Sequence, residues 1–245
     1  MFRFPLLALL MFIVTTVSAD DYPRLTNLPT IYINTFDNRP VTSKTDYIYA
    51  TMHYVDEADQ LTTYDSLQIR GRGNSTWGLA KKPFRIKFHS KEKFLGTGYA
   101  KAKSWTLLAN AGDKSLMRNA VTTLMGEFTS LKFNPAAKFV DLVLNGEFLG
   151  NYQISDQVEV RPHRVNITEQ DLPLADTSDI SGGYLLEVDG FYDGNTFVSS
   201  EYGVPIRIHY PDEEDIAYSQ TEYIRQYISG FERALANDNY TDARM

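Results

Sequence analysis

The chain has 245 residues and carries 24 Lys and Arg against 31 Asp and Glu, a formal net charge of −7. Its hydrophobic fraction of 43% and charged fraction of 22% are ordinary for a globular protein, and they exclude wholesale disorder. The sequence contains no cysteine, which excludes disulfides, thiolate catalysis, Cys-type zinc sites and a lipid-anchor cysteine.

Residues 1–19 are predicted to be a signal peptide rather than part of the fold. Arg3 is a short basic region, Pro5–Val14 is apolar, and Val17-Ser18-Ala19 matches a small-residue cleavage site. The apolar run is too short for a transmembrane helix. We therefore expect cleavage near Ala19 and a secreted or periplasmic protein with no membrane contact after cleavage.

The first half of the mature chain is predicted to be rich in strands. Apolar and aromatic segments bounded by turn residues predict strands at Thr30–Phe36, Asp46–Val55, Thr62–Ile69, Pro83–His89 and Ser104–Ala109. Within Pro83–His89, apolar residues alternate with Arg85, Lys87 and His89. This pattern predicts a strand with one apolar and one basic face. In isolation the basic face would be a solvated surface, whereas beside a glycine-rich turn it favours an anion-facing one.

The second half mixes helices and strands. Asp113 is a predicted N-cap for an amphipathic helix reaching about Thr129, and Asn145-Gly146 predicts a hairpin between Lys138–Leu144 and Leu149–Ser155. The polar, acidic segment His163–Ser181 predicts a loop. Further strands are predicted at Tyr184–Val188 and Val204–Tyr210, and a closing helix at Ile224–Leu235.

Positive charge gathers around one glycine turn. The segment Arg70–Lys103 holds ten Lys and Arg and one acidic residue, Glu92, which leaves 14 basic and 30 acidic residues in the rest of the chain. An acidic protein with one basic segment is expected to bind an anion there, and glycine turns add free backbone N–H donors. Export and overall acidity argue against nucleic acid as that anion.

The turn partly matches several motifs. Gly73 to Gly78 has the spacing of a P-loop without its lysine, and Gly71-x-Gly73 lacks the last glycine of a dinucleotide or kinase glycine-rich loop. The strand–turn–strand setting favours the kinase loop, while a tight hairpin turn remains the structural alternative. Ser75 lacks the nucleophile-elbow pattern, and the four histidines lack zinc-ligand spacing.

Taken together, these segments resemble the CotH kinase family, the spore-coat-protein-H type of secreted atypical protein kinase. The similarity spans Leu67–Asp189, in the order Ile69–Trp77 (IRGRGNSTW), Lys81–Phe88 (KKPFRIKF), Trp105–Asn119, Val140–Glu159 and Gly182–Asp189. The resemblance implies an α+β, kinase-like fold: an antiparallel N-lobe sheet with one packed helix, a hinge and the beginning of a C-lobe. The N-lobe and hinge would occupy residues 20–160, and the C-lobe would begin in residues 161–245.

The resemblance also implies ATP and a divalent metal, Mg or Mn, with transfer to serine hydroxyls of a secreted or surface protein. Residues expected to contact the nucleotide are Arg70, Gly71, Arg72, Gly73, Asn74, Ser75, Lys82, Arg85, Lys87 and Gln157. The glycine turn would cover the phosphates, Lys82, Arg85 and Lys87 are alternatives for the phosphate-binding cation, and Gln157 would lie at the hinge within Ser155–Glu159.

The sequence departs from the family in one respect. The metal-binding and catalytic carboxylates expected late in the family have no counterpart here, since neither Trp77 nor Trp105 precedes an aspartate and there is no D-F-G or H-R-D motif. No catalytic residue or metal ligand is therefore assigned, and we expect an inactive fragment lacking much of the C-lobe, or a pseudokinase. The alternative function is an exported, non-catalytic module that binds an anionic glycan or protein.

Overall fold

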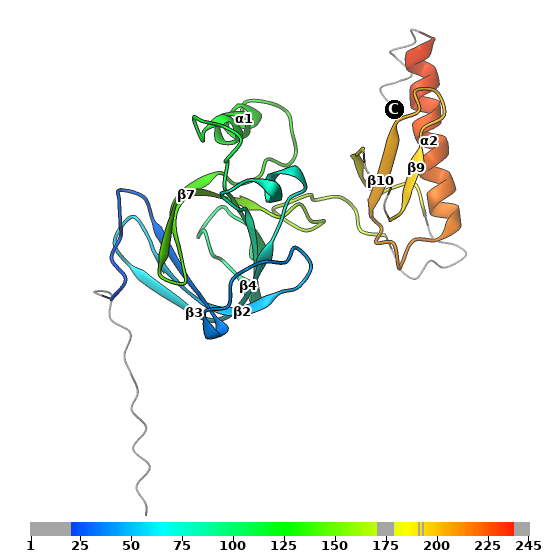
Figure 1. Cartoon of the computed structure of the whole chain (residues 1–245). Helices are drawn as coiled ribbons and strands as arrows, with labels where there is room; N and C mark the ends of the chain where they lie inside the picture. The colour runs from blue at the N-terminus through cyan, green and yellow to red at the C-terminus, as the bar shows by residue number, and fades with distance from the viewer. Residues whose placement is uncertain (1–20, 171–178, 191, 193, 238–245) are drawn as a thin grey trace, which may run out of the picture. The chain divides into compact units, whose positions relative to one another are not determined.

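A computed structural model describes residues 21–170, 179–190, 192 and 194–237 (Figure 1). The predicted signal peptide lies outside these residues. The chain forms two compact units, each described separately below. Within the described residues, the first comprises 21–94, 101–125 and 136–157; the second comprises 95–100, 126–135 and the described part of 158–237.

Seven strands of the first unit close into a barrel. They are β1 (Thr30–Thr35), β2 (Ile48–Val55), β3 (Leu61–Gly71), β4 (Phe84–Glu92), β5 (Ala102–Leu108), β6 (Lys138–Leu144) and β7 (Glu147–Asp156). Their order around the barrel is β1-β2-β3-β4-β5-β7-β6. Neighbours are antiparallel except β1 and β6, which pair in parallel and close the barrel.

The alternating pattern of the β4 sequence is confirmed by burial. Phe84, Ile86 and Phe88 are at most 3% exposed and lie in the barrel core with Trp105 and Leu107 of β5. The basic residues between them face outward. Burying this continuous apolar surface holds the barrel together, and it fixes which β4 side chains face solvent.

The hairpin between β6 and β7 forms where Asn145-Gly146 predicts it. Asn145 has φ 51° and Gly146 has φ 81°, the left-handed backbone that a two-residue turn of this kind requires. Leu144 pairs directly with Glu147 across the turn.

The predicted kinase-like N-lobe sheet with one packed helix is wrong. The strands form a closed barrel because β1 pairs with both β2 and β6, contacts between distant segments that no local pattern reveals. The helix α1 (Arg118–Glu127) also does not bury its apolar stripe: Val121, Leu124 and Met125 are 46%, 53% and 64% exposed. It begins later than predicted, because Leu116 has φ 60° and interrupts the turn after Asp113.

The second unit packs a helix on a small sheet. Strands β8 (Leu185–Val188), β9 (Thr196–Val198) and β10 (Pro205–Tyr210) are ordered β8-β10-β9, and α2 (Tyr218–Ala236) follows them. Phe197, Ile206, Ile208 and Ile224 form their common core. Sequence patterns predicted β8, β10 and α2 but not the short β9. The described part of predicted loop His163–Ser181 forms no helix or strand.

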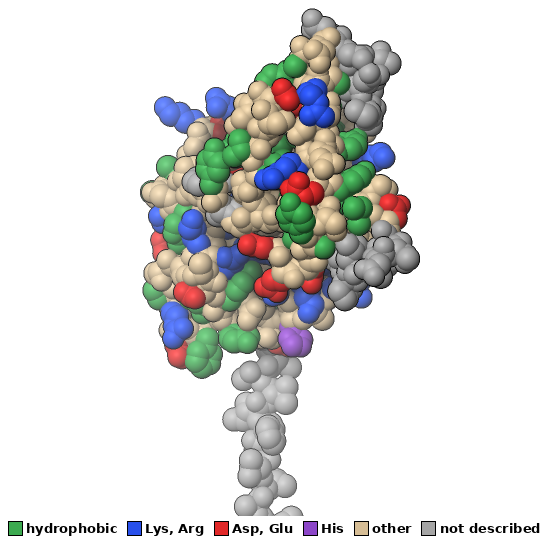
Figure 2. Space-filling model, turned by 90° about the vertical axis from the view of Figure 1, so that its right-hand side faces the viewer, with side chains coloured by type: hydrophobic (Ala, Val, Ile, Leu, Met, Phe, Trp, Pro, Cys, Tyr) green, Lys and Arg blue, Asp and Glu red, His purple; other side chains and the backbone are tan. Residues whose placement is uncertain are grey.

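One face of the molecule carries a mixture of side-chain types. On the face drawn in Figure 2, apolar side chains lie among basic and acidic ones and do not form one continuous patch. None of the helices in the described residues has the length and hydrophobicity needed to cross a membrane.

Candidate functional site

The outward face of β3 and β4 carries a ladder of basic side chains. Arg70 pairs directly with Arg85, and Gln68 with Lys87. On the side of β5, the Arg85 Nη2 donates to Ser104 Oγ at 3.1 Å. Like charges directly opposite on neighbouring strands repel and destabilise the pair. An anion bound to this face would relieve that repulsion.

Aromatic and backbone groups hold part of this ladder in place. The Arg70 guanidinium carbon lies 4.9 Å from the centre of the Tyr47 ring, and the Lys87 Nζ lies 5.7 Å from the same centre. Arg70 also donates from Nη1 to the carbonyl of Lys44. The predicted cations Arg70, Arg85 and Lys87 therefore share one surface, and Tyr47 adds an aromatic ring that sequence analysis did not select.

The glycine turn is packed against its own tryptophan. A Cβ on Gly71 would lie 2.4 Å from Cη2 of Trp77, and Gly73 has φ 88°, so both positions require glycine. Asn74 caps the short 3-10 helix η3 (Ser75–Gly78), its carbonyl accepting from the Trp77 N–H at 3.3 Å. The predicted turn residues thus form a rigid corner at the end of β3.

Lys82 stabilises this corner. Its Nζ donates to the Trp77 carbonyl at 2.6 Å and lies 5.2 Å from the Trp77 ring centre. The residue before it, Lys81, is placed differently, since its Nζ donates to the Asn151 carbonyl and lies 4.6 Å from the Tyr152 ring centre. The two adjacent lysines therefore have different surroundings, and the sequence alone does not predict this difference.

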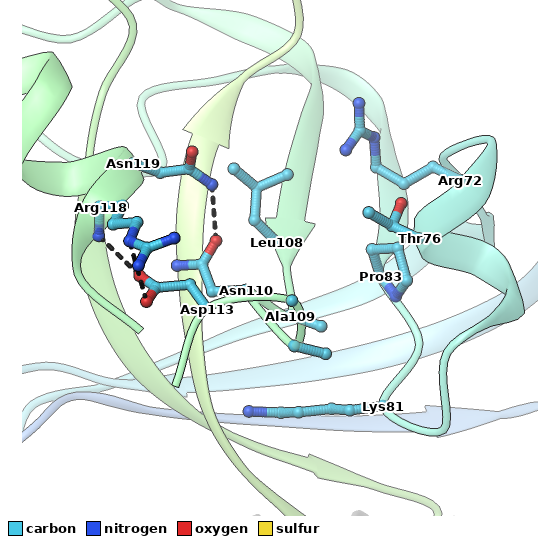
Figure 3. A pocket seen from close by; sticks show the side chains of 12 residues that line it. Arg72, Thr76, Lys81, Pro83, Leu108, Ala109, Asn110, Asp113, Arg118 and Asn119 are labelled. Atoms are coloured by element: carbon cyan, nitrogen blue, oxygen red, sulfur yellow. Dashed lines mark hydrogen bonds and ion pairs between the residues drawn. The ribbon is translucent and has the colours of Figure 1, made fainter. Parts of the chain in front are cut away.

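A cavity of about 280 Å³ lies between this corner and the start of α1 (Figure 3). Its lining residues are Arg72, Thr76, Lys81, Pro83, Leu108, Ala109, Asn110, Ala111, Gly112, Asp113, Arg118 and Asn119. Figure 3 shows Arg72 and Thr76 on one side and Asn110, Asp113, Arg118 and Asn119 on the other, with Lys81 below them in the view. Of the predicted nucleotide contacts, Arg72 is the one that lines this cavity.

The pKa of Arg72 is lowered by its position in the cavity wall. Burial lowers the pKa of its guanidinium, and repulsion from Arg85 and Arg70 lowers that pKa further. In the part of the chain that the structure describes, Arg72 forms no ion pair. Burial likewise lowers the pKa of Lys81, while Asp141 opposes that shift. Both cations are therefore held where an anionic ligand would be energetically favoured.

Amide side chains form the opposite wall of the cavity. The Asn119 Nδ2 donates to Asn110 Oδ1 at 2.7 Å, and the Asn110 Nδ2 donates to Gln153 Oε1 at 3.0 Å. Asn110 adopts φ 51°, a left-handed conformation that asparagine tolerates better than most residues. This network fixes the loop between β5 and α1.

Asp113 anchors the start of α1 instead of acting as its predicted N-cap residue. Its carboxylate accepts from the backbone N–H of Arg118 at 2.8 Å and of Ser115 at 3.0 Å. These hydrogen bonds lower its pKa from 3.8 to about 2, so Asp113 is ionised at neutral pH. The Arg118 side chain is 82% exposed, and its Nε lies 3.6 Å from Asp113 Oδ1. Because an exposed ion pair contributes little free energy, Arg118 can turn from Asp113 towards a ligand at little energetic cost.

The donor set suits a polyphosphate but not a metal ion. Three lining cations (Arg72, Lys81 and Arg118), the Asn119 amide and a nearby basic ladder supply donors to phosphate oxygens. Asp113 is the carboxylate among the cavity-lining residues, and its oxygens are already engaged by backbone donors. No group of three or more His, Cys, Asp or Glu residues suited to a metal occurs in the described ranges.

Gln157 lies apart from the cavity. It follows β7 directly, and Ser155 and Asp156 of the predicted hinge belong to that barrel strand. Because Asp156 pairs with Trp105 and Gln153 pairs with Leu108, Gln157 lies at the end of β7 away from the cavity. Sequence analysis selected Arg72 but missed Lys81 and Asn110. Arg118 and Asn119 follow a predicted helix start, which allows them either to face this site or to be solvated surface residues.

The chain was compared with known proteins. A search of curated proteins finds no match. The family described as CotH kinase protein matches residues 69–243. This stretch includes the basic ladder, the glycine turn, the cavity and most of the second unit, and it covers more than half of the chain. The protein therefore belongs to the CotH kinase protein family.

Proposed function

We propose that this protein binds ATP, with the triphosphate in the cavity between the glycine turn and α1. The observation that carries the proposal is the pair of partly buried cations, Arg72 and Lys81, on two sides of that cavity. A volume of about 280 Å³ is at the lower limit for a ligand pocket, so it suits the phosphates rather than a whole nucleotide.

The nucleoside is proposed to lie along the outward face of β3 and β4. Arg85 and Arg70 lie on this face, close enough to Arg72 to lower its pKa. Lys87 and the Tyr47 ring extend the same surface. A ligand placed this way would contact most of the predicted nucleotide-binding residues, but not Lys82, which does not line the cavity.

Family membership relates the protein to kinases. We propose that ATP binding in this fold serves phosphorylation of serine hydroxyls on a secreted or surface protein, and that the protein itself is exported. Because no catalytic carboxylate is assigned in this chain, we propose that the chain alone binds ATP without transferring its phosphoryl group. ATP would supply the phosphoryl group. The residues of the cavity orient its phosphates by charge and hydrogen bonding, which is most of what a protein contributes to this reaction. Because the cavity residues do not fit a metal ion, no catalytic step is assigned to one.

Adjacent lysines provide a matched test. Isothermal titration with ATP, with and without MgCl₂, should show binding to the unmodified chain and about tenfold or greater weakening in Lys81→Met, the loss of one charge-assisted contact. Lys82→Met removes an equal charge one residue away and should retain affinity within about threefold, because Lys82 does not line the cavity. Equal effects of both variants, or no binding heat, would refute the proposal.

A second candidate function is supported by the length of the basic ladder. Arg70, Arg85 and Lys87 present a row of cations beyond the cavity, and such a row also suits an anionic glycan or an acidic protein surface. Retention on a heparin column separates the two functions. A glycan-binding module would remain bound in the presence of excess ATP, whereas a nucleotide-binding site sharing these cations would be released by it.

A further inference from the structure

Strands β3 and β4 separate at one end of the barrel. Their pairing begins with the Leu67–Phe88 pair and ends with the Gly71–Phe84 pair. In the earlier part of β3, Leu61–Tyr64 pair with β2 on the other side and Asp65 and Ser66 lie in a register shift, while β4 continues to Glu92. In the described part of the chain, no strand pairs with the two edges that face each other across this opening. Backbone N–H and C=O groups at such edges are a template for another strand.

Irregular pairing on both sides produces the opening. The register between β2 and β3 shifts between Leu67 and Tyr64, and the register between β4 and β5 shifts between Lys87 and Glu92. A bulge bends its strand and increases the local twist, and bulges occur preferentially at barrel rims and beside functional sites. Two irregularities at the same level, on neighbouring strands, turn the strands away from each other.

The opening is a groove with a closed floor. A cavity of about 410 Å³ is lined by Thr62, Thr63, Tyr64, Asp65, Ser66, Phe88, His89, Ser90 and Glu92. The Tyr64 ring closes the floor, its centre 4.7 Å from that of Phe88 and 6.1 Å from that of Phe94. The core is thus sealed, while the strand edges and their hydroxyl side chains remain accessible.

The charged groups lining the groove are acidic. Asp65 is exposed and, within the described residues, forms no ion pair. Glu92 accepts a hydrogen bond from Ser90 Oγ at 2.5 Å. The burial of Tyr64 raises the pKa of its hydroxyl to about 12, and the negative charge of Glu92 adds to that rise. His89 also lines the groove, whereas the neighbouring Lys91 does not. A cationic side chain would complement the two carboxylates.

We propose that this groove binds an extended segment of a partner protein as an added β-strand, with a Lys or Arg side chain near Asp65 and Glu92. Backbone hydrogen bonds to the free strand edges supply affinity, and the carboxylates select the cation. At ~3.3 Å per residue, a segment of about six residues matches the free edge Leu61–Ser66. The groove contains none of the residues assigned to nucleotide binding, so it can be tested independently of ATP.

Labelled peptides test the backbone contribution. Fluorescence anisotropy with the whole chain should detect an alternating Thr–Lys peptide of about eight residues, long enough to span the free edge. Alternate backbone nitrogens point to opposite sides of a strand, so the two alternate sets are N-methylated in separate peptides. At least one of these peptides should bind about tenfold or more weakly, because N-methylation removes the donors without changing charge. Hydrogen exchange should show new protection within Leu61–Ser66. Equal binding of all three peptides would overturn the proposal.

Charge variants test the recognition of the cation. Asp65→Asn combined with Glu92→Gln should weaken the Thr–Lys peptide about tenfold, while leaving an alternating Thr–Ser peptide within about twofold. Glu147→Gln, an exposed carboxylate on β7 outside the groove, is the control and should change neither. A loss of Thr–Lys binding as large in Glu147→Gln as in the groove variant would show that overall charge, not this groove, binds the peptide.

Discussion

Arg72→Met should stabilise the fold and weaken nucleotide binding at the same time. Methionine keeps an unbranched apolar side chain at this position but removes a partly buried charge that Arg85 and Arg70 repel. An interaction between two side-chain charges near the protein surface is worth roughly 0.2–1 kcal/mol, so we expect the free energy of unfolding to rise by about 0.5 kcal/mol. For a chain of this size, that is a Tm increase of about 1–2 °C.

The same substitution should weaken ATP binding much more than it stabilises the protein. A hydrogen bond to a charged group is worth about 1.5–3 kcal/mol, or roughly 10- to 150-fold in affinity. Thermal unfolding followed by circular dichroism and titration calorimetry measure the two effects. Lys103→Met removes a basic residue that is exposed on β5 and outside the cavity, and it should change both quantities little. A destabilised Arg72→Met variant with unchanged affinity would refute the reasoning.

Two further predictions concern the supports of the cavity. Asp113 has a folded pKa of about 2 against an ordinary 3.8, so its stabilising contribution is complete above pH 3.8 and is lost as the pH falls through 2. Asp113→Asn should therefore flatten the pH dependence of unfolding between pH 4 and 2; an unchanged profile would contradict this. Gly71→Ala should displace the Trp77 ring, because the new Cβ would lie 2.4 Å from it, and should destabilise the fold by about 1–3 kcal/mol. Trp77 fluorescence should shift to the red, and an unchanged spectrum would show that the corner relaxes elsewhere.

Local patterns in the sequence predicted most strands, because the position of a strand depends mainly on residues that are close together in the chain. The alternation of Phe84, Ile86 and Phe88 with basic residues reflects burial on one face of a strand, and Asn145-Gly146 reflects the φ values of one turn. The barrel depends instead on β1 pairing with β6, which are separated by about half of the chain. Periodicity carries no information on such distant pairing.

The candidate site was predicted in part for the same reason. The sequence identifies the basic face because Arg85 and Lys87 alternate with apolar residues, and it selects Arg72 from the glycine turn. It does not separate Lys81 from Lys82, since the direction of each side chain depends on contacts with Asn151 and Trp77. The apolar stripe of α1 predicts a packed helix, yet that stripe is exposed, so periodicity alone did not establish its burial.

A crystal structure of this chain with a non-hydrolysable ATP analogue tests the central claim most directly. The account predicts phosphorus atoms in the cavity between Arg72 and Lys81, with the nucleoside extending over the outward face of β3 and β4. Phosphates bound elsewhere on the molecule, with this cavity unchanged, would contradict it.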